Sequence, residues 1–129
     1  MIVADTSAVF AFLYPRDQYN KQVVRVFFNE PTVIVPVAVL SELAYMVETR
    51  LGQYAMAAFL DNCQGGKFSL EWRETDLLRI QELMRQYADL PLGFADASVI
   101  ALAEHVGRVA TTDRRHFNVV RTKPLELLP

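Results

Sequence analysis

Short apolar runs alternate with longer amphipathic segments along this chain of 129 residues, and the alternation limits the folds that the chain can form. The runs expected to be strands cover residues 2–4, 32–35, 68–70, 109–111 and 119–120. The segments with helical spacing of apolar residues cover residues 8–14, 18–29, 37–50, 54–63, 74–87 and 94–106. Strands separated by helices form parallel sheets that need helices on both faces. The sequence therefore predicts an α/β protein with a covered parallel sheet.

Size and composition fit one domain without disulfides. The chain is 52% hydrophobic and 22% charged, which excludes a disordered protein. No apolar run reaches the roughly 18 residues that a membrane span needs, and no export signal is seen at the start of the sequence. Cys63 is the single cysteine, which fits a reducing compartment. We expect one domain over residues 1–129, located in the cytoplasm and without a membrane partner.

The net charge of −2, from 15 acids against 13 lysines and arginines, argues at face value against a nucleic-acid partner. If four of the acids hold a metal, however, the remaining surface is mildly positive. Composition alone therefore does not decide between the classes of partner.

Two acids directly follow expected strands. Asp5 ends a run that should form a buried strand, and the carboxyl edge of an open α/β sheet is where such proteins build their sites. An aspartate that only caps the next helix would look the same. Asp113 follows the strand expected over 109–111, where an exposed turn is the alternative.

Two further acids lie in expected helices beside apolar residues. Glu42 is three residues after Val39 and four before Met46, and Asp96 is four before Ile100. A buried carboxylate without a partner costs several kcal/mol, so such an acid needs a base or a metal. The alternatives are a glutamate at the edge of the apolar stripe and a first-turn aspartate favoured by the helix dipole.

The four acids together predict a metal site. If they converge at the strand ends, they cannot all remain ionised without a cation, because like charges raise one another's pKa. Carboxylate oxygens suit magnesium or manganese, whereas zinc prefers histidine and cysteine. The two histidines, His105 and His116, do not have metal-ligand spacing.

The segments that carry these acids resemble the PIN-domain family, in particular its VapC-type toxin ribonucleases. The similar segments are Asp-Thr-Ser-Ala at 5–8, residues 39–43, residues 92–97 and Thr-Thr-Asp-Arg-Arg-His-Phe at 111–117. Each motif is weak alone, but the ordered set spans nearly the whole chain. The resemblance implies a three-layer α/β/α sandwich around a mainly parallel sheet of four or five strands.

The same resemblance implies a metal-dependent endoribonuclease, the toxin of a type II toxin–antitoxin system. Such proteins hydrolyse RNA phosphodiester bonds, are held inactive by a small antitoxin and are often homodimers. The catalytic and metal-binding cluster, holding Mg²⁺ or Mn²⁺, would be Asp5, Glu42, Asp96 and Asp113. Ser7 and Thr112 match positions whose hydroxyl groups support the acids or the metal's water.

The residues after the fourth acid depart from some relatives, which carry another acid there. This chain has Arg114, Arg115 and His116, which argues against a complete second metal site. The two arginines lie beside Asp113 and are candidates for binding a substrate phosphate, with a solvated loop pair as the alternative. We expect His116 at the surface. Large apolar residues between positions 37 and 63 suggest a surface for self-association and for the antitoxin.

Other functions fit the sequence less well. A haloacid dehalogenase-type phosphatase would have an acid where Ser7 stands, and a receiver domain would have paired acids after the first strand. The Gly65-Gly66-Lys67 segment lacks the spacing of a phosphate-binding loop. The alternative that remains open is a non-catalytic PIN-like or receiver-like module that binds magnesium for signalling or interaction.

Overall fold

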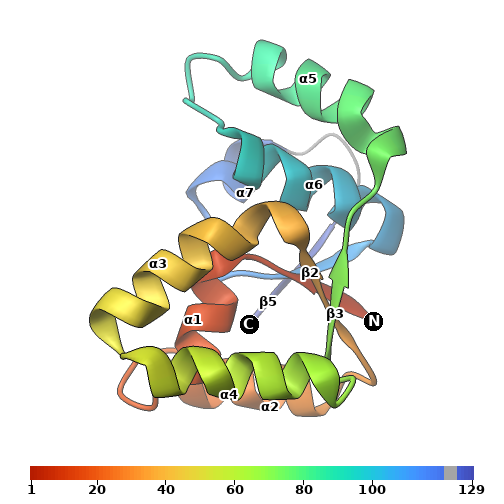
Figure 1. The fold of residues 1–129 in the computed structure, drawn as a ribbon. Helices are drawn as coiled ribbons and strands as arrows, with labels where there is room; N and C mark the ends of the chain where they lie inside the picture. The colour runs from red at the N-terminus through yellow and green to blue at the C-terminus, as the bar shows by residue number, and fades with distance from the viewer. Residues whose placement is uncertain (121–124) are drawn as a thin grey trace.

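The computed structural model describes residues 1–120 and 125–129, and its centre is a five-stranded sheet whose neighbouring strands all run parallel (Figure 1). The strands are β1 (Ile2–Ala4), β2 (Val33–Pro36), β3 (Phe68–Glu71), β4 (Arg108–Ala110) and β5 (Glu126–Leu128). Their order in the sheet is β3-β2-β1-β4-β5, so β1 is central. The predicted α/β class with a parallel sheet is confirmed.

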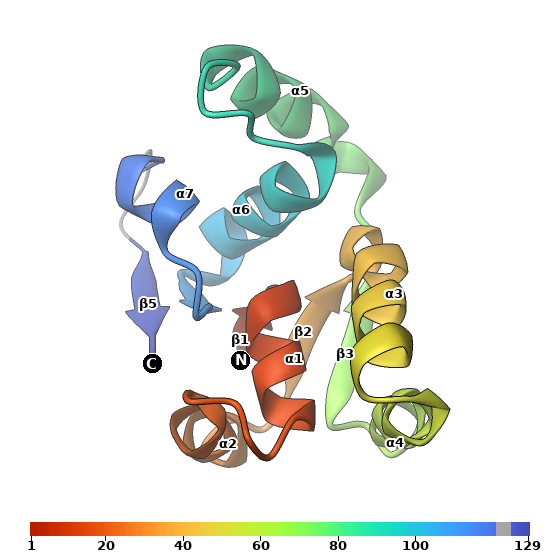
Figure 2. The same cartoon turned by 90° about the vertical axis from the view of Figure 1, so that its left-hand side faces the viewer.

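Helices connect the strands and cover the sheet (Figure 2). They are α1 (Thr6–Leu13), α2 (Asn20–Phe28), α3 (Leu40–Arg50), α4 (Gln53–Gln64), α5 (Leu77–Gln86), α6 (Phe94–Val106) and α7 (Arg115–Val119). Short 3₁₀ turns, Val37–Val39 and Glu74–Asp76, precede α3 and α5. No helix in the described part of the chain is long and apolar enough to cross a membrane.

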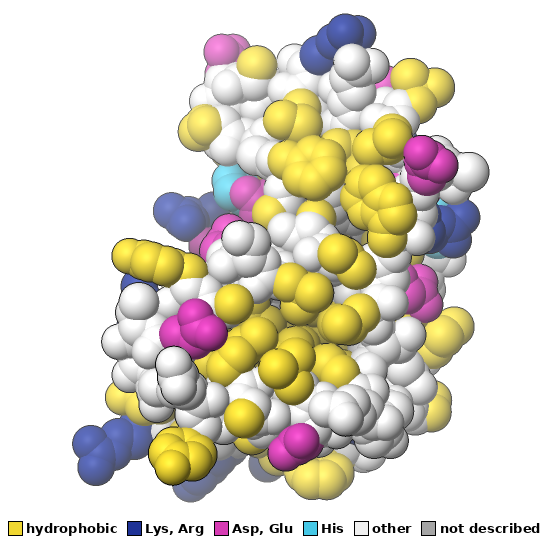
Figure 3. All heavy atoms as spheres, viewed as in Figure 1, with side chains coloured by type: hydrophobic (Ala, Val, Ile, Leu, Met, Phe, Trp, Pro, Cys, Tyr) yellow, Lys and Arg dark blue, Asp and Glu magenta, His cyan; other side chains and the backbone are white. Residues whose placement is uncertain are grey.

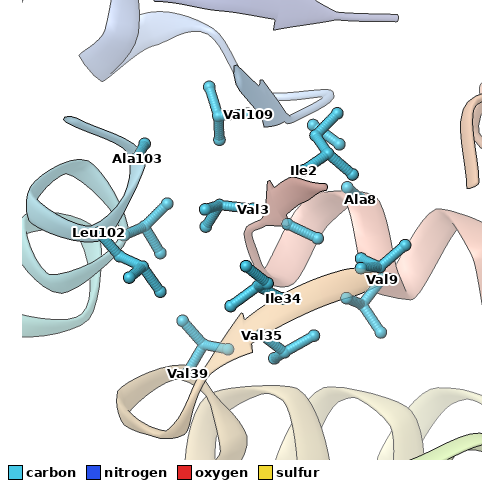
Figure 4. Close-up of a cluster of buried hydrophobic side chains, with 14 of the residues drawn as sticks. Ile2, Val3, Ala8, Val9, Ile34, Val35, Val39, Leu102, Ala103 and Val109 are labelled. Carbon is cyan, nitrogen blue, oxygen red and sulfur yellow. The ribbon is translucent and has the colours of Figure 1, made fainter. Parts of the chain in front are cut away.

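The core lies on both faces of β1. Val3 points to the side where Leu102 of α6 lies, and Val9 of α1 lies on the opposite side of the strand (Figure 4). All three residues of β1 are fully buried, as expected for the central strand of a parallel sheet. The apolar run at the start of the sequence is therefore explained by burial on two faces.

The prediction of a strand at residues 119–120 is wrong. Residues Arg115–Val119 form α7, and the last strand is β5, which pairs with β4. Phe117 and Val120 are both buried and stand three residues apart, which is close to one helical turn. Val119 thus ends a helix of five residues, which is too short to recognise from sequence, and Val120 is its C-cap.

The order of the strands places a crevice at one edge of the sheet. From β1 the chain moves outward through β2 and β3, and it then returns to the other side of β1 for β4 and β5. The carboxyl ends of β1 and β4 therefore flank the point where the direction reverses, which is where open α/β sheets bind ligands. In receiver-like domains the first strand lies between the second and third, so this sheet is not receiver-like.

Candidate metal-binding active site

All four predicted acids line one cleft at the carboxyl ends of β1 and β4. Asp5 follows β1, Asp113 follows β4, Glu42 lies in the first turn of α3 and Asp96 in the first turn of α6. The residues that line the cleft are Asp5, Thr6, Ser7, Val39, Glu42, Ala95, Asp96, Val99 and Asp113. Four segments that are far apart in sequence thus each contribute one acid to the same cleft.

Asp5 is the most firmly held of the four. Its Oδ1 accepts hydrogen bonds from the Ser7 hydroxyl at 2.7 Å and from the Ala8 N–H at 2.9 Å. Its Oδ2 accepts a hydrogen bond from the Thr111 hydroxyl at 2.5 Å. The bond from Ala8 is the N-cap of α1, so the capping role and the position in the cleft belong to the same carboxylate.

Burial makes the charge on Asp5 costly. Removal from water raises the pKa of its carboxyl group from 3.8 to about 6, although the hydrogen bonds from Thr111, Ser7 and Ala8 work in the opposite direction. The negative charge of Asp96 adds to the increase. A nearby cation would reverse this balance and favour the ionised form.

Asp113 is paired with an arginine that lies outside the lining of the cleft. The Arg115 side chain donates from Nε to Oδ1 at 2.9 Å and from Nη2 to Oδ2 at 2.8 Å, so the pairing is bidentate. The hydrogen bonds from Arg115 hold the pKa of Asp113 below its usual value. Arg115 itself is mostly exposed, with 81% of its side chain accessible.

Asp96 and Glu42 form the more open part of the cleft. The Asp96 carboxylate is half-exposed, and its Oδ2 lies 3.4 Å from Nδ1 of His116. Glu42 is exposed and does not lie on a buried stripe as the sequence spacing suggested, because the buried face of α3 is formed by Leu43 and Val47. Glu42 therefore lies at the rim of the cleft.

Hydroxyl groups support the cleft, as expected, but one of them was missed. Ser7 bonds to Asp5 as described above, whereas Thr112 contributes its backbone N–H to the Ser7 hydroxyl at 2.9 Å. The hydroxyl that reaches Asp5 belongs to Thr111. The pairing of Ala4 with Ala110 places Thr111 next to Asp5, so the register of β1 and β4 was the missing signal.

The two arginines after Asp113 point to different places. Arg114 donates to the backbone carbonyls of Leu127 and Pro129, which ties it to the β5 segment. Arg115 faces Asp113. His116, expected at the surface, is only partly exposed and lies against Asp96. The basic groups that face the cleft acids thus come from the start of α7.

The donor set suits a hard divalent cation. Four carboxylates and the hydroxyls around Asp5 offer oxygen ligands, and the partly buried Asp5 carboxylate has a charge that a cation would neutralise. Within residues 1–120 and 125–129, no three acidic, histidine or cysteine side chains converge closely enough to hold a metal as arranged. Asp113 and Asp96 are instead paired with Arg115 and His116.

Comparisons with known proteins point to one family. The family model described as "PIN domain" matches residues 2–122. Ribonuclease VapC26 of Mycobacterium tuberculosis (strain ATCC 25618 / H37Rv) is 29% identical over 124 residues, which cover 93% of this chain and 92% of that protein. The crystal structure of Mycobacterium tuberculosis VapC20, described as a sarcin-ricin loop cleaving toxin, has a TM-score of 0.83 at 20% identity and covers 100% of both chains. The crystal structure of FitAcB from Neisseria gonorrhoeae has a TM-score of 0.66 at 20% identity and covers 100% of this chain and 97% of that one. VapC20 and FitAcB thus have the same fold as this chain.

Proposed function

This chain belongs to the PIN-domain family, and on that premise we propose that it is a metal-dependent endoribonuclease, the toxin of a toxin–antitoxin pair. The observation that carries the proposal is the single cleft that Asp5, Glu42, Asp96 and Asp113 line together. The relative named ribonuclease VapC26, similar over 93% of this chain, supports RNA as the substrate. The reaction is hydrolysis of an RNA phosphodiester bond.

In this proposal the four acids hold Mg²⁺ or Mn²⁺. When bound, the ion lowers the pKa of a water molecule and neutralises charge on the phosphoryl oxygens. Asp5 is kept in one orientation by the Ser7 and Thr111 hydroxyls, which would support its carboxylate as a ligand of the ion. Asp96 and Glu42 are more open to solvent, and we assign to one of their carboxylates the acceptance of the proton from the attacking water.

RNA cleavage by the purified protein tests the proposal. We expect cleavage with magnesium or manganese and none with EDTA. Asp5→Asn and Asp96→Asn should each lower the rate at least about 100-fold, because a metal ligand is lost while the shape is kept. Asp61→Asn, which changes an exposed acid on α4 outside the cleft, is the matched control and should cleave normally. Wild-type rates in either cleft variant, with unchanged circular dichroism, would rule out the assignment.

We also propose a homodimer that forms through α5. Hydrophobic side chains gather in a band across the face shown in Figure 3, from the region of α5 toward α3 and α4. A groove there is lined by Leu77, Leu78, Ile80, Gln81, Met84, Arg85, Ala88 and Phe94. Exposed apolar patches of this kind usually mark a partner surface. The groove lies outside residues 37–63, where the sequence suggested self-association.

The antitoxin surface that we propose is the exposed part of α3 and α4. Tyr45 is 70% exposed and Tyr54 94% exposed, and α3 also carries Glu42 at the cleft. A small protein bound along α3 therefore reaches the cleft and can block it. If a small protein is encoded beside this chain, its co-expression should yield a complex without nuclease activity. Tyr45→Asp should release that partner and restore cleavage.

A further inference from the structure

One acid of the cleft already has a cationic partner. Arg115, at the start of α7, forms a bidentate pair with Asp113, and its backbone N–H also lies 3.3 Å from Asp113 Oδ1. The pair uses both carboxylate oxygens of Asp113. These are the same oxygens that a metal would need from this residue.

The neighbouring arginine provides an internal comparison. Arg114 carries the same charge one residue earlier in the chain, but its guanidinium donates to the carbonyls of Leu127 and Pro129. Contact with the cleft acid is therefore a property of Arg115 and not of the Arg-Arg motif in general.

From this geometry we propose that Arg115 is an internal counter-ion of Asp113 that competes with the divalent metal and is exchanged for it. The inference rests on the proposed function, since it takes Asp113 as a metal ligand. A guanidinium bound to both oxygens of Asp113 neutralises part of the negative charge that this carboxylate can offer a metal ion, so the two cations compete for it. Metal binding therefore releases Arg115 from Asp113.

The exposure of the pair makes this exchange feasible. The side chain of Arg115 is 81% exposed and that of Asp113 is 43% exposed, so water weakens their attraction. A divalent ion that is shared by several carboxylates is attracted more strongly to Asp113 than one exposed guanidinium is, because it carries twice the charge. After release, the planar guanidinium stands at the rim of the cleft and suits a phosphate of the bound RNA.

Calorimetric titration of the full chain with Mn²⁺, without RNA, tests the exchange. The Arg115→Gln variant removes the competing charge and should bind Mn²⁺ about three- to fivefold more tightly than the wild type, as expected for loss of an exposed ion pair. The Arg114→Gln variant removes an equal charge nearby and should bind with the wild-type affinity. In an Asp113→Asn background, the change Arg115→Gln should no longer alter the affinity.

The outcomes separate this inference from the proposed function. If Arg115→Gln binds Mn²⁺ with the wild-type affinity while Asp5→Asn does not bind it, the metal site remains but the proposed exchange is wrong. Equal gains in Arg114→Gln and Arg115→Gln would also overturn it, because they would indicate a general charge effect. A wild-type protein that binds no Mn²⁺ would remove the metal site and this inference together. Melting temperatures of the variants show whether each is folded.

Discussion

Among single side chains, Thr111 links the two segments that carry Asp5 and Asp113. Its hydroxyl donates to Asp5 and also accepts the backbone N–H of Asp113 at 3.1 Å. One buried group thereby fixes the segments after β1 and β4 relative to each other. The side chain of Asp5 and the backbone at Asp113 are both held by it.

Thr111→Val keeps the shape but removes these hydrogen bonds. We expect cleavage to fall about tenfold at neutral pH, in line with the value of a hydrogen bond to a charged group. The acidic limb of the pH–rate profile should move to higher pH, because a bond that lowers the pKa of Asp5 is lost. Single-turnover rates across the profile provide the measurement. Thr112→Val, which retains the backbone N–H to Ser7, is the control; equal losses in both variants would contradict the role of Thr111.

The raised pKa of Asp5 gives the stability of the protein a defined pH dependence. The pKa of Asp5 is about 6 in the folded protein, against the ordinary aspartate value of 3.8 that applies to the unfolded chain. Between these two pH values the folded state therefore binds more protons than the unfolded state. Without metal, stability should fall by about 3 kcal/mol as the pH rises through this window and should then level off. Urea unfolding in EDTA at several pH values measures it. Asp5→Asn should flatten the curve, and a wild-type-like slope in that variant would disprove the assignment.

The sequence predicted the acids of the cleft but not the partners of those acids. Asp5, Glu42, Asp96 and Asp113 stood out because acids are unusual beside apolar runs. The contacts of Arg115 and His116 with two of these acids depend on side-chain rotamers and on the short α7, which sequence patterns do not reveal. Glu42 was misplaced because helical spacing alone does not indicate which edge of α3 faces solvent.

Among the helices, α6 shows how an element positions a site. Its buried residues include Ala97, Ala101 and Ala103, whose small side chains allow the helix to pack closely against the sheet. Asp96 in its first turn is thereby held over the carboxyl end of β1. Gly107 ends the helix in the left-handed conformation, with φ of 88°, and the chain then enters β4 directly.

Gly107→Ala should destabilise the protein by about 1 kcal/mol, measured by urea unfolding. An added Cβ at Gly107 meets no atom within 4 Å, so the cost comes from the backbone conformation alone. Gly65→Ala is the control, because Gly65 also ends a helix but with a φ of −78° that alanine adopts without strain. Equal effects at the two glycines would contradict this explanation.

The helices were easier to predict than the last strand. Segments such as 94–106 have long apolar patterns and glycine or proline at their ends, so their limits were predicted closely. By contrast, β5 has three residues and none of them is fully buried. Its position depends on the free edge of β4, which is a property of the folded sheet and not of the local sequence.

At the scale of the whole molecule, an exposed apolar groove lies along α5. Leu78 is 67% exposed there. We expect a dimer at micromolar concentration in sedimentation experiments, and Leu78→Asp should convert it to a monomer because a charge would be buried in the interface. Tyr54→Asp, on α4, should leave the dimer intact. The reverse result would place the interface between residues 37 and 63, and a monomeric wild type would exclude the dimer.

The pairing of β1 with β4 also has a consequence during synthesis of the protein. Asp5 and Thr111, which bond to each other, are separated by 106 positions. Asp5 leaves the ribosome early, but Thr111 and Asp113 follow only after most of the chain has been translated. Until then the central strand lacks its β4 neighbour, and no complete set of cleft residues exists. An unfinished chain thus has no complete cleft and should have no nuclease activity.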